Sequence, residues 1–314
     1  MPTLKEKIEG GLVGLLVGDA LGVPYEFHQR REIPPLAEIE FDPPEGFARS
    51  HGRVSPGTWS DDGAHALILL ASLLDRGKLD LEDLSRRFVN WYNYGYKAVD
   101  AHVFDVGAQT RQAINCLQSG VPAHEAGGKD EYANGNGSLM RVLPLALWHK
   151  GTLQELIADA HKQSVVTHGH LRSQVCCALY CVWARFTLED RSSPWQAAVA
   201  SLRDVYGKTS PEHAELESSI RPDDPADGTG SGYVVDCLRS ARWATEAGTY
   251  EQVVKAAISL GNDTDTTACV AGGIAGIRDG IQAIPERWRT RLRGKELYED
   301  ELQQLICRRC GEDS

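Results

Sequence analysis

Residues 261–267 read Gly-Asn-Asp-Thr-Asp-Thr-Thr and run directly into a segment of small apolar residues, Ala-Cys-Val-Ala-Gly-Gly-Ile-Ala-Gly, at 268–276. The apolar residues recur at i, i+3 and i+4, which predicts a buried helix over 264–279. One polar residue is enough to cap such a helix. Two carboxylates at this position, Asp263 and Asp265, would repel each other and lose hydration. This cost is offset if a cation neutralises them. We therefore interpret this segment as half of a metal site.

A second cluster of the same kind occurs much earlier in the chain. Ser60, Asp61 and Asp62 stand immediately before a strongly apolar helical pattern at 64–74. Two groups of carboxylates and hydroxyls, each at the start of a buried helix, could supply the oxygen ligands of one or two hard cations. Such ligands suit Mg²⁺, Mn²⁺ or Ca²⁺ better than zinc.

The remaining patterns are helical as well, and convincing alternating strands are absent from the sequence. Two stretches, 29–55 and 187–230, are polar and are expected to be loops. We predict an all-α, compact orthogonal helical bundle with the metal ligands projecting into its centre. The expected helices cover 4–21, 64–74, 81–94, 104–118, 138–149, 152–161, 164–186, 231–247, 249–260, 264–279 and a final pair within 285–307.

Bulk composition narrows the class of protein. The 314 residues are 42% hydrophobic and show no break in composition, so we expect one domain over 1–314, with a helical core at about 4–280 and C-terminal helices at about 285–307. A net charge of −11 disfavours nucleic acid and anionic membrane as partners. The most apolar run, 12–23, is interrupted by Asp19, so we expect no membrane-spanning helix. The eight cysteines do not show the spacing of a disulfide framework in a secreted protein, so we expect a cytoplasmic location.

Taken together, the motifs resemble those of the ADP-ribosylglycohydrolase family, which includes the dinitrogenase-reductase-activating glycohydrolases and the ADP-ribosyl-acceptor hydrolases. The resemblance covers about residues 8 to 280, with the motifs in family order. They are Gly18-Asp19-Ala20-Leu21-Gly22 with Glu26, Trp59-Ser60-Asp61-Asp62, Asn134-Gly135-Asn136-Gly137-Ser138-Leu139-Met140-Arg141, Thr167-His168, and Gly261–Thr267.

The resemblance implies an all-α hydrolase with a centre of two Mg²⁺ ions, or Mn²⁺, that removes ADP-ribose from a modified protein side chain. An arginine linkage is favoured and a serine linkage is possible. Glu26 resembles a mobile family glutamate that contacts metal or substrate, and with Asp61, Asp62, Asp263 and Asp265 it makes up the implied catalytic set. The implied metal ligands are Ser60, Asp61, Asp62, Asp263, Asp265 and Thr266.

Substrate contacts are expected mainly from the glycine-rich motif. Its backbone N–H groups, leading into a helix expected near Leu139, would cradle a pyrophosphate. Asp130 is a candidate contact to the scissile group or the leaving side chain. The resemblance implies that His168 forms a hydrogen bond to the adenosine ribose and that the ring of Tyr233 stacks on adenine. The candidate substrate-binding residues are Asp130, Asn134, Asn136, Gly137, Ser138, Met140, His168 and Tyr233.

The sequence leaves several alternatives open. Glu26 could be a solvated loop carboxylate, and His168 could be an ordinary helix cap. The expected partners are an ADP-ribosylated protein as substrate and ADP-ribose as product. A second enzyme hypothesis changes the substrate to a small ADP-ribose derivative. A third is a binding module, either an ADP-ribose sensor or an immunity protein that blocks an ADP-ribosyltransferase. The acceptor linkage, the identity of the metal and the oligomeric state are not determined by the sequence.

Overall fold

The computed structural model describes residues 1–311, and within them the regular structure is entirely helical, which confirms the all-α prediction. Three isolated β-bridges pair loop residues, including Gln29 with Gly261 and Gly135 with Tyr233. The α-helices are α1 Leu4–Gly22, α2 Asp61–Arg76, α3 Leu81–Tyr94, α4 Ala108–Gln118, α5 Leu143–Trp148, α6 Leu153–Val165, α7 Leu171–Leu188, α8 Pro194–Tyr206, α9 Pro211–Glu215, α10 Val234–Thr245, α11 Tyr250–Ile258, α12 Thr264–Asp279, α13 Glu286–Arg291 and α14 Glu299–Cys310.

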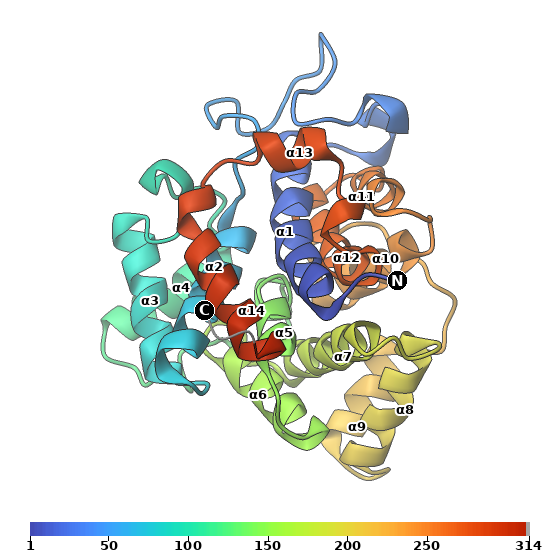
Figure 1. Ribbon diagram of the computed structural model, residues 1–314. Helices are drawn as coiled ribbons and strands as arrows, with labels where there is room; N and C mark the ends of the chain where they lie inside the picture. Colours follow the sequence, from blue (N-terminus) through green and yellow to red (C-terminus); the bar gives the residue numbers. More distant parts are fainter. Residues whose placement is uncertain (312–314) are drawn as a thin grey trace.

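Helices α1 and α12 lie side by side at the centre of the molecule (Figure 1). Their backbones approach closely because small residues face each other along the contact. A Cβ atom on Gly18 would lie 2.2 Å from the carbonyl oxygen of Ala268, and one on Gly276 would lie 2.0 Å from that of Gly10. The segment Leu4–Tyr25 is long and apolar enough to cross a membrane, yet 94% of its most apolar window is buried inside the protein. It therefore packs as a core helix.

The close contact of α1 with α12 allows a prediction about the free energy of unfolding. Gly276→Ala should destabilise the protein by about 3 kcal/mol, because the new methyl group would meet backbone rather than a movable side chain. Gly52→Ala is the matched control, since a Cβ there meets no atom within 4 Å. Urea unfolding of the two variants beside wild type measures the difference. Equal midpoints for all three proteins would show that the helices are free to move apart.

Some helix boundaries differ from those predicted. The polar stretch 187–230 was expected to be a loop, but it contains α8 and α9. In α8, Trp195, Ala198, Val199 and Leu202 are buried on one face, so an apolar stripe anchors this helix to the core. Helix α4 begins at Ala108 rather than 104, α5 at Leu143 rather than 138, and α7 at Leu171 rather than 164. Each of these three starts leaves a site-forming loop free of the helix.

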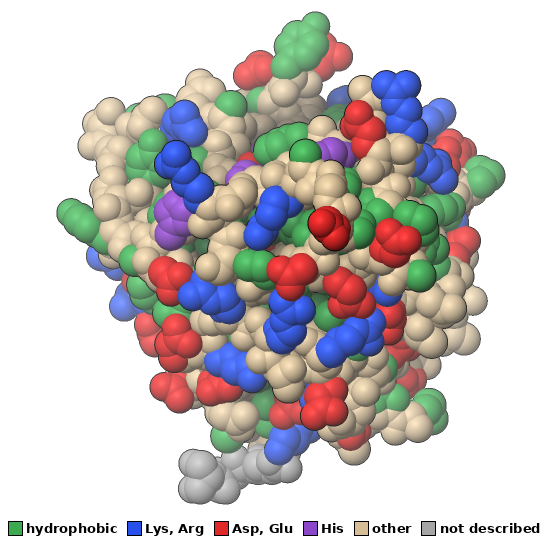
Figure 2. Space-filling model, turned by 90° about the horizontal axis from the view of Figure 1, so that it is seen from above, with side chains coloured by type: hydrophobic (Ala, Val, Ile, Leu, Met, Phe, Trp, Pro, Cys, Tyr) green, Lys and Arg blue, Asp and Glu red, His purple; other side chains and the backbone are tan. Residues whose placement is uncertain are grey.

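The segment 29–55 is mainly irregular, as predicted, and forms the blue loops that project above α1 and α13 in Figure 1. Ile39 and Phe41 are fully buried and anchor its middle part. Glu40 accepts hydrogen bonds from Arg287 at 2.9 Å and from the indole of Trp288 at 2.5 Å, both on α13. Positive and negative side chains are intermixed over the face seen from above (Figure 2). The middle part of this segment is therefore fastened to α13.

Candidate active site

The two acidic clusters predicted from the sequence come together where α2 and α12 begin. Ser60 caps α2 by accepting the N–H of Asp62 at 3.3 Å. The hydroxyl of Thr266, in the first turn of α12, donates to Asp62 Oδ1 at 3.3 Å and so links the two helix starts. Asp19, buried in α1, accepts the N–H groups of Ser60 and Gly63 at 2.9 and 2.7 Å. The carboxylate of Asp19 thus fixes the first turn of α2 instead of pointing at a ligand.

A cavity of about 320 Å³ opens over this junction. Both acidic clusters, the glycine-rich loop and the histidine of the Thr-His motif contribute to it. The first and last of these lining residues are more than 200 positions apart in the sequence. The residues around it are Glu26, Asp61, Asp62, Asp105, Gly107, Ala108, Gln109, Thr110, Tyr132, Gly135, Asn136, Gly137, Met140, His168, Gly232, Asp263 and Thr266.

The buried carboxylates around this cavity are short of hydrogen-bond partners. Within the described residues, Asp62 Oδ2 and both carboxylate oxygens of Asp265 are buried without a partner. Burial raises the pKa of Asp61, Asp62 and Asp265 well above the ordinary value, and neighbouring carboxylates raise it further. Carboxylate oxygens of Asp62, Asp265 and Asp19 all lie within 4.8 Å of one another, as do those of Glu26, Asp263 and Asp265. The unpartnered oxygens of Asp62 and Asp265, together with these neighbouring carboxylates, could bind hard metal ions.

The six predicted metal ligands occupy different depths. Asp61, Asp62, Asp263 and Thr266 line the cavity, whereas Asp265 is fully buried at its base. Ser60 is also buried, and its hydroxyl oxygen, used once as the cap of α2, keeps a second lone pair. A ligand set of carboxylates and hydroxyls fits Mg²⁺ or Mn²⁺ in its donor chemistry.

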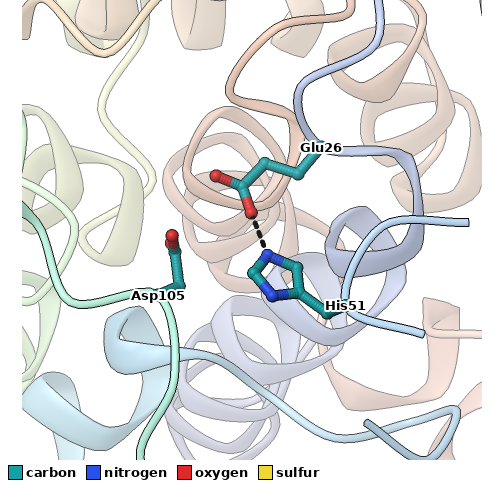
Figure 3. A group of neighbouring side chains, drawn as sticks. All are labelled: Glu26, His51 and Asp105. Carbon is teal, nitrogen blue, oxygen red and sulfur yellow. Dashed lines mark hydrogen bonds and ion pairs between the residues drawn. The ribbon is translucent and has the colours of Figure 1, made fainter. Parts of the chain in front are cut away.

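Glu26 is held inside the site rather than in solvent (Figure 3). Its side chain is buried, and Oε2 shares a hydrogen bond of 2.6 Å with His51 Nε2. Asp105 arrives from a separate segment and lies beside this pair (Figure 3). Burial raises the pKa of Glu26 to about 10, and the charges of Asp105 and Asp263 add to the effect. The reading of Glu26 as a solvated loop carboxylate is therefore wrong for this structure.

Sequence reasoning missed Asp105 and His51. Asp105 fell inside a helix predicted from residue 104, but it has a positive φ of 52° in the loop before α4, where its side chain can face the cavity. His51 adopts a positive φ of 50° in the polar segment 29–55, where no periodic pattern marks it. Its ring packs between Phe104, at a centroid distance of 5.0 Å, and Phe27, at 5.7 Å. Only the tertiary fold brings these groups to Glu26.

The glycine-rich loop does not lead into a helix at Leu139, because α5 starts at Leu143 and residues 137–141 form turns. The backbone N–H of Gly135 donates to Gln109 and that of Asn136 to Gly232. Within the described residues, the N–H groups of Gly137 and Ser138 have no partner, but Ser138 is fully buried and does not line the cavity, so the N–H of Gly137 remains for an anion. The Asn136 side chain donates to Asp263 Oδ2 at 2.9 Å and thereby orients a predicted metal ligand.

Other predicted substrate residues are divided between the cavity and its surroundings. Met140 lines the cavity, and His168 does so with only 2% of its surface exposed. Asn134 and Tyr233 line a second hollow next to it, where the ring of Tyr233 is 39% exposed. Ser138 is fully buried behind the loop and bonds to other side chains, and Asp130 is exposed outside the cavity. The structure therefore does not bring Asp130 and the Ser138 hydroxyl to the cavity.

The raised pKa values predict how a bound cation should stabilise the protein. Burial raises the pKa of Asp19 to about 7, and it also raises the pKa of Asp265 well above the ordinary value. Between the ordinary and the raised pKa the folded chain holds more protons than the unfolded chain, so the metal-free protein loses stability as pH rises. A cation must displace these protons. The increase in melting temperature caused by Mg²⁺ should therefore be larger at about pH 8 than at about pH 5. An equal increase at both pH values would contradict this.

The helical fold and the acidic cavity define an all-α protein whose site is suited to hydrolysis beside bound cations. A family model described as ADP-ribosylglycohydrolase matches residues 1–313, and the chain belongs to this family and is an enzyme of that class. This confirms the resemblance found in the sequence motifs.

Individual relatives agree with this assignment. The ADP-ribosylarginine hydrolase Tri1 of Serratia proteamaculans is 29% identical, over 96% of this chain and 79% of its own length. The ADP-ribosyl-[dinitrogen reductase] glycohydrolase of Rhodospirillum rubrum is 27% identical, over 93% of this chain and 92% of its own. A solved structure titled ADP-ribosylglycohydrolase-related protein complex has a TM-score of 0.78 at 30% identity, covering 96% of this chain and 97% of that one.

Proposed function

We propose that this protein is a metal-dependent hydrolase that removes ADP-ribose from arginine side chains of modified proteins. The observation that carries the proposal is the set of buried, unpartnered carboxylate oxygens at the base of the cavity. Besides the proposed metal ligands, Glu26 and Asp105 line the cavity and none of the described lining residues is Lys or Arg, so these two carboxyl groups favour a cationic leaving group such as guanidinium. Similarity to proteins named for ADP-ribosylarginine and for ADP-ribosylated dinitrogen reductase supports the same substrate class.

Two Mg²⁺ or Mn²⁺ ions would be held by the carboxylates Asp61, Asp62, Asp263 and Asp265, with the hydroxyls of Ser60 and Thr266 as further ligands. Four carboxylates balance the charge of two divalent ions. When bound, such ions supply orientation of the ribose hydroxyls and a lowered pKa for a water molecule.

The remaining steps belong to side chains of this protein. Cleavage of a ribosyl C1–N bond passes through a transition state that resembles an oxocarbenium ion and needs a positioned water molecule on one face. Glu26, oriented by His51, is the carboxyl group best placed to orient that water. Glu26 would be ionised and could accept the proton when cations bound by the neighbouring aspartates offset the negative charges that raise its pKa. Asp105 lies beside Glu26 and would face the departing group. The N–H group of Gly137 would bind the pyrophosphate.

The experiment that tests the proposal compares peptides of identical sequence that carry ADP-ribose on arginine or on serine. We expect release of free ADP-ribose from the arginine-linked peptide with Mg²⁺, and loss of release when a chelator is added. Cleavage only of the serine linkage would leave the reaction class in place and correct the acceptor. Cleavage that persists in chelator would contradict the metal dependence.

The two alternative functions give separate outcomes in the same assay. A protein that hydrolyses small ADP-ribose derivatives would release ADP-ribose from an O-acyl derivative but from neither peptide. A binding or immunity protein would bind ADP-ribose or an ADP-ribosyltransferase and release nothing. The set of unpartnered buried carboxylates argues against a pure binding role, because binding a neutral or anionic partner gains nothing from them.

A further inference from the structure

Behind the cavity, a fully buried arginine is connected to His168 through a single hydroxyl. Arg141 has no exposed surface and lies over the ring of Phe88, with its guanidinium carbon 4.8 Å from the ring centroid. Its guanidinium donates to the backbone carbonyls of Gly137 and Gln163, at 3.2 and 2.8 Å. It also donates to the Gln163 side chain at 2.9 Å and to Thr167 Oγ1 at 2.6 Å. Arg141 thus supports the glycine-rich loop and Thr167 at once.

The hydrogen bond from Arg141 determines what Thr167 can do. A guanidinium carries only N–H donors, so Thr167 Oγ1 is the acceptor of that bond. The hydroxyl proton of Thr167 is then left to find another acceptor in a position with no exposed surface. Within the described residues the acceptor in reach is His168 Nδ1, at 2.8 Å. A buried hydroxyl proton without an acceptor would be costly, so this bond is made.

We infer that Arg141 and Thr167 are positioning residues that fix the tautomer of His168, with Nδ1 as the acceptor and the proton on Nε2. Because Nε2 then carries an N–H, His168 presents a donor to the cavity. The group of the ligand that meets it must be an acceptor, such as a ribose hydroxyl oxygen or a phosphate oxygen. Assigning this ligand as ADP-ribose rests on the proposed function, whereas the tautomer itself does not.

The geometry of the loop agrees with this assignment. A Cβ atom on Gly137 would lie 2.7 Å from His168 Cε1 and 3.1 Å from Nε2, so glycine lets this edge of the ring reach the lining of the cavity. Nε2 has no hydrogen-bond partner within the described residues, yet it is not one of the polar atoms that are fully buried without a partner. It is therefore accessible from the cavity. Burial, reinforced by the charge of Arg141, lowers the pKa of His168 to about 3, so the ring is neutral at neutral pH.

The tautomer can be observed directly. Two-bond ¹H–¹⁵N NMR spectra of the full-length protein separate protonated from unprotonated ring nitrogens, and His168→Asn identifies the His168 signals among those of the ten histidines. We expect a protonated Nε2 and an unprotonated Nδ1 in wild type and in Thr167→Ser, which keeps the hydroxyl. Thr167→Val should lose this single-tautomer pattern. A protonated Nδ1 in wild type, or an unchanged pattern in Thr167→Val, would overturn the inference.

Binding of ADP-ribose gives a second readout that a general loss of stability would not reproduce. Thr167→Val should weaken ADP-ribose binding about tenfold, while Thr167→Ser should bind as wild type does. Thr187→Val is the matched control, because this variant also loses a buried threonine hydroxyl. The hydroxyl of Thr187 donates to the carbonyl of Trp183 within α7, and it lies away from the cavity. Equal binding by Thr167→Val and wild type would overturn the positioning role. If wild type binds no ADP-ribose, the proposed function fails, and the NMR spectra still decide the tautomer.

Discussion

Asp265→Asn is expected to lower kcat/KM for ADP-ribose release by about 10³-fold, because the variant loses an anionic metal ligand at the base of the cavity. Both Asp265 carboxylate oxygens are buried without a partner in the described residues. The same substitution should raise the melting temperature of the chelator-treated protein at neutral pH, since a neutral amide replaces a carboxyl that burial and the charges of Glu26 and Asp62 disfavour as an anion. Activity and metal-free stability should therefore change in opposite directions.

The control for this experiment is Asp204→Asn, which makes the same chemical change at an exposed position of α8. It should leave both activity and melting temperature unchanged. The stabilisation by Mg²⁺ should also shrink in Asp265→Asn, because one anionic ligand is lost. If Asp265→Asn kept wild-type activity, or if it destabilised the metal-free protein while losing activity, the assignment of Asp265 as a metal ligand would not hold.

Glu26→Gln is expected to lower kcat by about 10²- to 10³-fold with a small change in KM, because it removes the carboxylate that orients and deprotonates water. The glutamine oxygen can still accept a hydrogen bond from His51, whose Nε2 lies 2.6 Å from Glu26 Oε2. Steady-state kinetics with an arginine-linked ADP-ribosyl peptide measure the two parameters separately. This variant therefore tests the charge of Glu26 while preserving its position.

Glu45→Gln is the matched control for Glu26→Gln, since Glu45 is an exposed glutamate of the neighbouring segment 29–55. Its kinetics should equal those of wild type. A Glu26→Gln variant with unchanged kcat would remove Glu26 from the catalytic set. A variant with a large rise in KM alone would instead assign Glu26 to uniform binding of the substrate.

The acidic clusters were predictable because each depends on local sequence. Asp61 and Asp62 open α2, and Asp263 and Asp265 open α12, so the periodicity of each apolar helix locates its N-terminus and the carboxylates with it. That the two helix starts meet was an inference from charge, since unpaired buried carboxylates are costly. The hydrogen bond from Gly63 to Asp19, which joins α1 to the first turn of α2, is made only in the tertiary fold.

The parts of the site that sequence reasoning missed depend on tertiary contacts. Asp105 and His51 are brought to Glu26 by loops with positive φ values, and no periodicity encodes such positions. The glycine-rich loop was recognised by composition, but its internal hydrogen bonds were not, so the number of N–H groups left for an anion was overestimated. Helix α8 was missed for a different reason. Its apolar stripe is short, and the polar composition around it obscured the helical spacing.

The measurement that tests the account most directly is the anomalous difference map of a crystal of this protein soaked in Mn²⁺. The account predicts two strong peaks at the base of the cavity, within ligand distance of Asp61 and Asp62 from one cluster and of Asp263 and Asp265 from the other. The absence of any peak there, in a protein that still releases ADP-ribose in the presence of chelator, would contradict it.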